Sequence, residues 1–227
     1  MITVTRRLCA AALAAVLLLA AAPLSPAADA AFADAEGSWA ADVIQKAEEY
    51  GLMEGYPDGT FGVGRELTRV EFVTVLCRMF SWDTVTPESP SFSDCSASHW
   101  AYSYVETALA HGVMDAGGAF RPEDYISREE MAVMLVRAMG YGTIAGLAQD
   151  LPMPFRDVTT NVGYIAMAHE LGLVNGTAAT TFSPDQTATR EQAAVMLIRL
   201  YDSYHAAAPE KTGIAYSAEG LTDLTGY

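Results

Sequence analysis

The sequence predicts a mainly α-helical protein built from three tandem helix-loop-helix repeats, and two observations support this. First, the chain aligns with itself at a period of roughly 60 residues, which indicates a repeated structural unit. Second, a short polar element opens an apolar stretch of helical spacing in each copy. The copies also share an opening Phe-x-Asp, a central glycine and a later phenylalanine. In chain order these are Phe32, Asp34, Gly51 and Phe61, then Phe92, Asp94, Gly112 and Phe120, then Phe155, Asp157, Gly172 and Phe182.

The first helix of each repeat is predicted just before the central glycine. Apolar residues stand four and seven positions before Gly51, Gly112 and Gly172, which is the spacing of one helix face. Each glycine is expected at the left-handed position that ends such a helix. The apolar pairs are Ala47 and Ile44, Ala108 and Val105, and Ala168 and Ile165.

A tryptophan precedes the first helix in two of the repeats. Trp39 and Trp100 stand twelve residues before the central glycine, and Thr160 takes this position in the third repeat. A large ring at the start of a helix usually belongs to the core. The alternative is a partly exposed ring beside a groove, where the face of an indole can stack on a sugar.

The second helix of each repeat is predicted to begin with a capping box around an arginine. The Ser or Thr at the N-cap and the Glu or Gln three residues later each satisfy one free backbone N–H group. The arginine lies at the positive end of the helix dipole, where a cation costs some stability. It either forms an anion site with free helix N–H groups or pairs with a neighbouring acidic side chain. The three elements are Thr68-Arg69-Val70-Glu71, Ser127-Arg128-Glu129-Glu130 and Thr189-Arg190-Glu191-Gln192.

The rest of the second helix has a regular apolar face. Arg78, Arg137 and Arg199 follow near its end, where the helix dipole favours a cation. Cys77 falls on the apolar face and is expected in the core, which argues against a disulfide with Cys95. The residues six and seven positions after each arginine are Val75 and Leu76, Met134 and Leu135, and Met196 and Leu197.

Composition and motifs exclude several classes of function. The 227 residues include 13 Lys and Arg against 28 Asp and Glu, so nucleic acid is a poor partner. Residues 1–30 have a basic start, an apolar run and an Ala-x-Ala site, which is typical of a secretory signal peptide. We therefore expect an exported protein without a membrane span after cleavage. No catalytic or metal-binding motif is found, and no cofactor is expected.

These patterns divide the chain into a signal peptide, three repeats and a tail. The repeats are expected at 31–80, 91–140 and 154–201, and the tail at 202–227. The stretches 81–91 and 140–154 are predicted linkers.

The combination of motifs resembles the S-layer homology domain family, which anchors bacterial surface proteins to the cell wall. The resemblance covers about residues 32–201 and rests on the Phe-x-Asp openings, the tryptophans, residues 51–61 and the Thr-Arg-x-Glu element. It implies a pseudo-threefold assembly around a central helical bundle, with ligand grooves between repeats. The implied ligand is a secondary cell-wall polysaccharide attached to peptidoglycan, often carrying a pyruvyl ketal whose carboxylate an arginine can bind. The implied groove residues are Arg69, Arg128, Arg190, Asp34, Asp94, Asp157, Trp39 and Trp100.

The third repeat departs from the family pattern. Thr160 replaces the tryptophan and Gln192 replaces the glutamate, so its groove is expected to be weakened, although glutamine can still close a capping box. The aspartates also have a simpler interpretation, as acceptors that cap local structure. The leading hypothesis is a secreted, non-catalytic anchor at the cell surface. One alternative is a scaffold module for protein association, including self-association, and another is the anchor fragment of a larger surface enzyme.

Overall fold

The structure is a computed structural model, and it describes residues 32–207. Within these residues the chain forms seven α-helices, and its loops contain only isolated β-bridges. The prediction of a mainly helical protein is therefore confirmed. None of the described helices is both long enough and apolar enough to cross a membrane. The helices are α1 (Ala41–Glu49), α2 (Arg69–Met79), α3 (Tyr102–Ala110), α4 (Arg128–Ala138), α5 (Gly142–Leu147), α6 (Val162–Glu170) and α7 (Arg190–Ala207).

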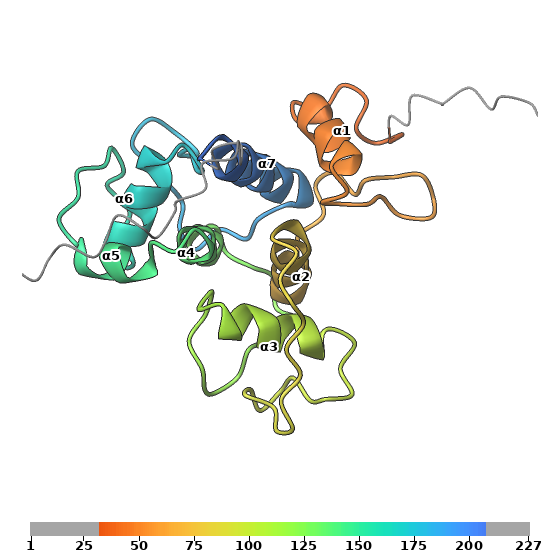
Figure 1. Cartoon of the computed structure of the whole chain (residues 1–227). Coiled ribbons are helices and arrows are strands. Elements are labelled where there is room, and N and C mark those ends of the chain that lie inside the picture. The colour runs from red at the N-terminus through yellow and green to blue at the C-terminus, as the bar shows by residue number, and fades with distance from the viewer. Residues whose placement is uncertain (1–31, 208–227) are drawn as a thin grey trace, which may run out of the picture. The chain divides into compact units, whose positions relative to one another are not determined.

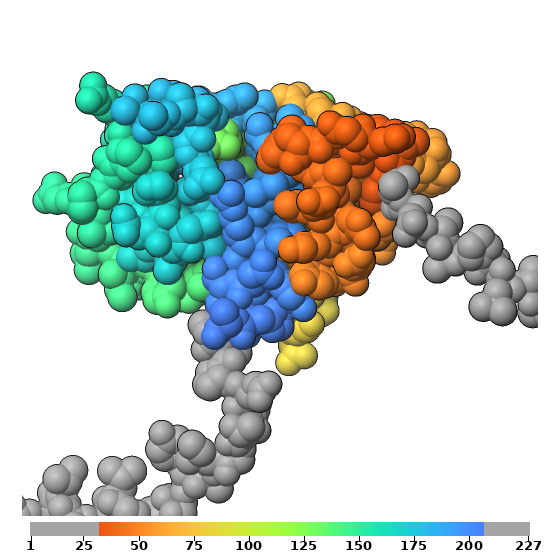
Figure 2. Space-filling model, turned by 90° about the horizontal axis from the view of Figure 1, so that it is seen from above, coloured from red at the N-terminus to blue at the C-terminus, as the bar shows by residue number. Residues whose placement is uncertain are grey.

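Helices that pack together come from different repeats. The first helix of the second repeat, α3, lies against α2 of the first repeat, and α6 lies against α4 in the same way (Figure 1). The first described helix, α1, packs against α7 of the third repeat. Figure 2 shows this contact at the surface, with the first repeat in orange beside α7 in blue. The beginning and end of the described chain therefore hold each other in place.

A closed ring of backbone hydrogen bonds joins the three repeats just before their second helices. The Leu67 N–H group donates to the Ala188 carbonyl at 3.0 Å, and Ala188 donates to Ile126 at 2.9 Å. Ile126 completes the ring by donating to the Leu67 carbonyl at 2.9 Å. All three side chains are fully buried. The ring fixes the positions of the three arginines, because each arginine follows two residues later.

The core positions predicted from helical spacing are buried. The phenylalanine after each central glycine, the apolar pair before it and the leucine of each second helix are all at most 1% exposed. Gly51, Gly112 and Gly172 have φ angles of 64°, 71° and 71°, which glycine adopts more readily than other residues. The predicted helix ends are therefore confirmed.

Both cysteines in the described residues are buried free thiols, which confirms the expectation for Cys77. The Cys77 Sγ atom donates to the Tyr104 carbonyl at 3.3 Å. Burial raises the pKa of the Cys77 thiol to about 12, so this side chain is a core residue and not a nucleophile.

The structure adds helix to one predicted linker and to the start of the predicted tail. The stretch 140–154 contains α5, which approaches α6 so closely that a Cβ atom on Gly163 would lie 2.1 Å from the Ala145 carbonyl oxygen. The last described helix, α7, continues past Tyr201 to residue 207, and the Tyr201 ring stacks on Tyr50, the residue that follows α1, with centroids 4.6 Å apart. The predicted signal peptide and the tail from residue 208 lie outside the described residues.

Candidate functional site

The helices α2 and α4 begin with closed capping boxes. The Thr68 hydroxyl accepts a hydrogen bond from the Glu71 N–H group at 3.3 Å, and Glu71 accepts one from the Thr68 N–H group at 2.8 Å. Ser127 and Glu130 make the same reciprocal pair at 3.1 and 3.0 Å. Each helix begins at its arginine, so these two predicted helix starts are confirmed.

The capping box expected at the start of α7 does not form. Thr189 Oγ1 and Gln192 Oε1 are both buried, and neither has a hydrogen-bond partner among the described residues. The expectation that glutamine closes the box is wrong, because the amide oxygen accepts no bond from the N-cap N–H group and the Thr189 hydroxyl accepts none from the helix. The helix still begins at Arg190, whose N–H group donates to the Arg65 carbonyl at 2.8 Å.

Backbone N–H groups at the helix starts are bonded to the neighbouring repeat. The Arg69 N–H group donates to the Asp124 carbonyl at 2.9 Å, and the Arg128 N–H group donates to the Gln186 carbonyl at 2.9 Å. The expectation that free helix N–H groups join the arginine in an anion site is therefore wrong. An anion near these helix starts must be bound by side chains.

The three helix-start arginines reach into the next repeat and are buried there. Their exposed fractions are 9% for Arg69, 5% for Arg128 and 8% for Arg190. Each Nε atom donates to the backbone carbonyl of a repeat phenylalanine, and each guanidinium lies over the ring of that same phenylalanine. These bonds couple the repeats to one another. The Nε to oxygen distances are 2.8 Å for Arg69 and Phe120, 2.9 Å for Arg128 and Phe182, and 2.9 Å for Arg190 and Phe61.

The buried arginines lie in three grooves, and all three repeats contribute to each groove. One repeat supplies the buried arginine, the next supplies a loop and its second helix, and the remaining repeat supplies a residue at or beside the tryptophan position. The volumes are about 250, 300 and 270 Å³ for the α2, α4 and α7 grooves, named after the helix that lines each one. The α2 groove contains Arg190, Arg78 and Trp100, the α4 groove contains Arg69, Arg137 and Asn161, and the α7 groove contains Arg128, Arg199 and Trp39.

The two tryptophans predicted for the grooves, Trp39 and Trp100, are exposed there. Trp39 is 69% exposed and Trp100 is 61% exposed, so the interpretation of these rings as core residues is wrong. The α4 groove has no indole, and Thr160 and Asn161 donate hydrogen bonds to Glu129 there at 2.7 and 2.5 Å. The missing tryptophan of the third repeat therefore affects the groove that contains Arg69.

The three aspartates hold loops and do not line the grooves. Asp34 accepts hydrogen bonds from the N–H groups of residues 61, 62 and 63 at 2.7, 2.8 and 2.7 Å. Asp94 and Asp157 each accept bonds from two successive N–H groups in the matching loops. Burial alone would raise the pKa of Asp34, but the backbone hydrogen bonds outweigh it and lower this pKa. The geometry matches the simpler interpretation, in which each carboxylate fixes the loop that receives a buried arginine.

Each groove also contains an arginine that the sequence pattern explains only by the helix dipole. Arg78, Arg137 and Arg199 line the grooves beside the buried arginine of another repeat. Arg137 also forms an ion pair with Asp115 at 2.8 Å. The sequence did contain a sign of this role, because these arginines stand at the same position in all three repeats. A favourable interaction with the helix dipole does not by itself require an arginine at a matched position.

The sequence of all three repeats matches one known protein family. The model for the S-layer homology domain matches residues 31–73, 91–132 and 154–194. The chain belongs to the S-layer homology domain family. Each match ends inside the second helix of a repeat, so all three include the arginine that begins that helix.

Several curated relatives share this region with the chain. Cell surface glycoprotein 1 of Acetivibrio thermocellus is 34% identical over 130 residues, which cover 52% of this chain and 6% of the relative. An amylopullulanase of Thermoanaerobacterium thermosulfurigenes is 31% identical over 181 residues, covering 77% of this chain and 10% of the relative. A cellulosome-anchoring protein of Acetivibrio thermocellus is 33% identical over 132 residues, which cover 56% of this chain and 28% of the relative. The chain thus spans less than a third of each of these relatives.

Proposed function

We propose that this protein is a non-catalytic anchoring module that binds an anionic secondary cell-wall polysaccharide, such as one carrying pyruvyl ketals, through its grooves. The protein is located at the cell wall or cell surface. Relatives that are a cell surface glycoprotein and a cellulosome-anchoring protein support this function. The observation that carries the proposal is the pairing of a buried arginine with a second arginine in each of three matched grooves.

The chemistry of the grooves suits an acidic sugar. A guanidinium group has five N–H donors, and the Arg128 side chain uses two nitrogens for the carbonyls of Phe182 and Asn175. Its third nitrogen makes no hydrogen bond within the described residues, so a carboxylate can accept from it. Burial lowers the pKa of Arg128, which means that the charged form gains from an anionic partner. The exposed face of Trp39 adds a flat apolar surface for the sugar ring.

We also infer that a pseudo-threefold axis relates the repeats around their second helices. The closed ring of backbone bonds and the cyclic pairing of the helices support this arrangement. A polymer that repeats its acidic sugar can occupy more than one groove, and multivalency then raises the retention of the protein on the wall.

The experiment is sedimentation of the mature protein with cell-wall sacculi before and after removal of the secondary polymer. The helix-start arginines hold the repeats together, so the informative variant changes Arg78, Arg137 and Arg199 to Gln instead. We expect polymer-dependent pelleting that this triple variant loses. The matched control is Arg156→Gln, because Arg156 is exposed and lines no groove. Pelleting that ignores both the polymer and the triple substitution would overturn the proposal.

Two other candidate functions each have an observation in their favour. Protein association is favoured by α5, where Ile144 and Leu147 are 60% and 81% exposed. It predicts binding that survives loss of the groove arginines but not the substitution of these two side chains. A role as the anchoring part of a larger surface enzyme is favoured by the amylopullulanase relative, of which the chain covers 10%.

A further inference from the structure

We propose that the three grooves are unequal, with the α7 groove as the principal site for the acidic sugar and the arginines of the α4 groove already neutralised by the protein's own carboxylates. The inference rests on the proposed function and identifies the residue that decides which groove is used. That residue lies three positions after the N-cap, where α4 has Glu130 and α7 has Gln192.

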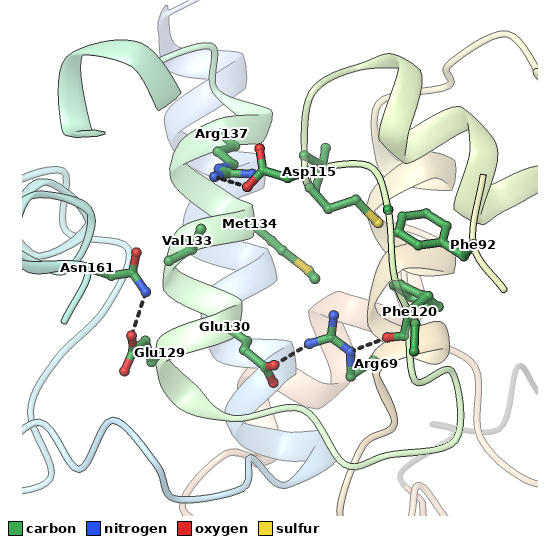
Figure 3. Close-up of a pocket in the computed structure, with 14 residues that line it drawn as sticks. Arg69, Phe92, Asp115, Phe120, Glu129, Glu130, Val133, Met134, Arg137 and Asn161 are labelled. Atoms are coloured by element: carbon green, nitrogen blue, oxygen red, sulfur yellow. Dashed lines mark hydrogen bonds and ion pairs between the residues drawn. The ribbon is translucent and has the colours of Figure 1, made fainter. Parts of the chain in front are cut away.

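Acidic side chains already neutralise the arginines of the α4 groove. Glu130 forms an ion pair with Arg69 (Figure 3) and a second one with Arg121. Arg137 is paired with Asp115 at 2.8 Å on the opposite side. A sugar carboxylate in this groove would meet guanidinium groups whose charge Glu130 and Asp115 already offset, and no indole is present to compensate.

The α7 groove has arginines at the two matching positions, Arg128 and Arg199, but it lacks these carboxylates. Asn175 stands where the α4 groove has Asp115, and Gln192 stands where it has Glu130. No acidic residue is found among the described residues that line this groove. Asp157 acts on Arg128 from outside the groove, but its oxygens already accept backbone N–H groups.

The side chain of Gln192 is a second mark of an unfilled site. Its Oε1 atom is buried in the groove wall and has no hydrogen-bond partner among the described residues. An unpaired buried acceptor costs free energy, so the protein gains if the amide turns toward the groove and accepts from a hydroxyl or amide of the bound sugar. The α7 groove thus offers guanidinium groups to the acidic group of the ligand, an indole to the sugar ring and a neutral acceptor to a sugar hydroxyl or amide.

The α2 groove is intermediate. It contains Glu54 and Glu71 beside its two arginines, but neither glutamate forms an ion pair with Arg78 or Arg190. Glu71 instead accepts hydrogen bonds from the N-cap of its own helix. In a chain of net charge −15, the local balance of charges decides where an anion binds, so we rank the α7 groove first, the α2 groove second and the α4 groove last.

The test uses a methyl glycoside of 4,6-pyruvylated N-acetylmannosamine as the probe and its neutral methyl ester as the control. Heteronuclear NMR reports the grooves separately through the indole N–H signals and the hydrogen-bonded arginine Nε–H signals. Trp39 and Arg128 report the α7 groove, and Arg69 reports the α4 groove. Trp82 is an internal control, because its ring is stacked between Phe80 and His111 and lines no groove.

We expect Trp39 and Arg128 to respond at the lowest probe concentration, Arg69 not to respond, and the ester to have no effect. Gln192→Glu should weaken binding in the α7 groove by about tenfold or more, because it places a carboxylate beside the ligand's own. Gln149→Glu adds the same charge at an exposed site away from the grooves and should change nothing.

The reciprocal substitution Glu130→Gln should make Arg69 respond to the probe. Asp115→Asn provides a second route, because it frees Arg137 without touching the capping box. Equal responses of Arg69 and Arg128 in the unmodified protein, or no effect of Gln192→Glu, would overturn the ranking and leave the proposed function standing. A protein in which no signal responds to the probe overturns both.

Discussion

The starts of α4 and α7 have nearly the same four residues and use them differently. At α4, Glu130 closes the capping box and pairs with Arg69 of another repeat. At α7, Gln192 does neither, and its buried oxygen has no partner. A carboxylate at this position stabilises both the helix and the contact between repeats, whereas an amide leaves the neighbouring arginine with its full charge. A carboxylate at this position therefore favours the stability of the fold, and an amide favours the binding of an anionic ligand.

The largest expected effect is the loss of a helix-start arginine. Arg69→Ala and Arg128→Ala should each lower the free energy of unfolding by roughly 2 kcal/mol or more, since a buried carbonyl loses a charged donor. Arg69→Ala also removes the ion pair with the partly exposed Glu130, which keeps Arg121 as a partner, and Arg128→Ala also removes the bond to the Asn175 carbonyl. Urea denaturation of both variants measures the losses. A loss below about 1 kcal/mol in either variant would show that its arginine does not hold the repeats together.

Sequence spacing predicted much of the fold and less of the site. The glycine positions and helical periods gave both helices of each repeat, because these signals are local and reflect backbone geometry and burial. The pairing of α1 with α7 is not encoded in any short stretch, so the three-repeat composition of each groove escaped prediction. From the sequence, Thr160 and Gln192 were both expected to weaken the groove of the third repeat. In the structure, Thr160 lies beside the α4 groove and Gln192 lines the α7 groove.

The reciprocal exchange of residues 130 and 192 should change stability in opposite directions. Gln192→Glu should raise the free energy of unfolding by about 1 kcal/mol, since it completes a capping box that is now open. Glu130→Gln should lower it by a similar amount or more. Differential scanning calorimetry of the two single variants and the double variant tests this pair, and a fall in Tm for Gln192→Glu would contradict the role assigned to the open box.

Acid should lower the stability of the loops that Asp94 and Asp157 hold, to a similar extent in each. The pKa of Asp94 is lowered because backbone hydrogen bonds outweigh the effect of burial, and hydrogen bonds from Phe182 and Ser183 lower the pKa of Asp157. Stability from these carboxylates is complete above their ordinary pKa of 3.8 and is lost as the pH falls through the lower pKa of the folded state. Thermal unfolding between neutral pH and pH 2 should show this loss, and Asp94→Asn and Asp157→Asn should each reduce its steepness. An unchanged pH profile in both variants would exclude the aspartates as its source.

The smallest effect on stability is expected from the exposed rings. Trp39→Ala and Trp100→Ala should each change the free energy of unfolding by less than about 0.5 kcal/mol, because the indoles are mainly in contact with solvent. Retention on polymer-bearing sacculi should nevertheless fall in both variants, and further for Trp39→Ala, whose groove faces no opposing carboxylate. Thr160→Ala, at the same position of the third repeat, is the matched control and should retain full binding. A loss of retention with Thr160→Ala equal to that of Trp39→Ala would place the ligand in the α4 groove as well, and the distinction between the two helix starts would then have no consequence for binding.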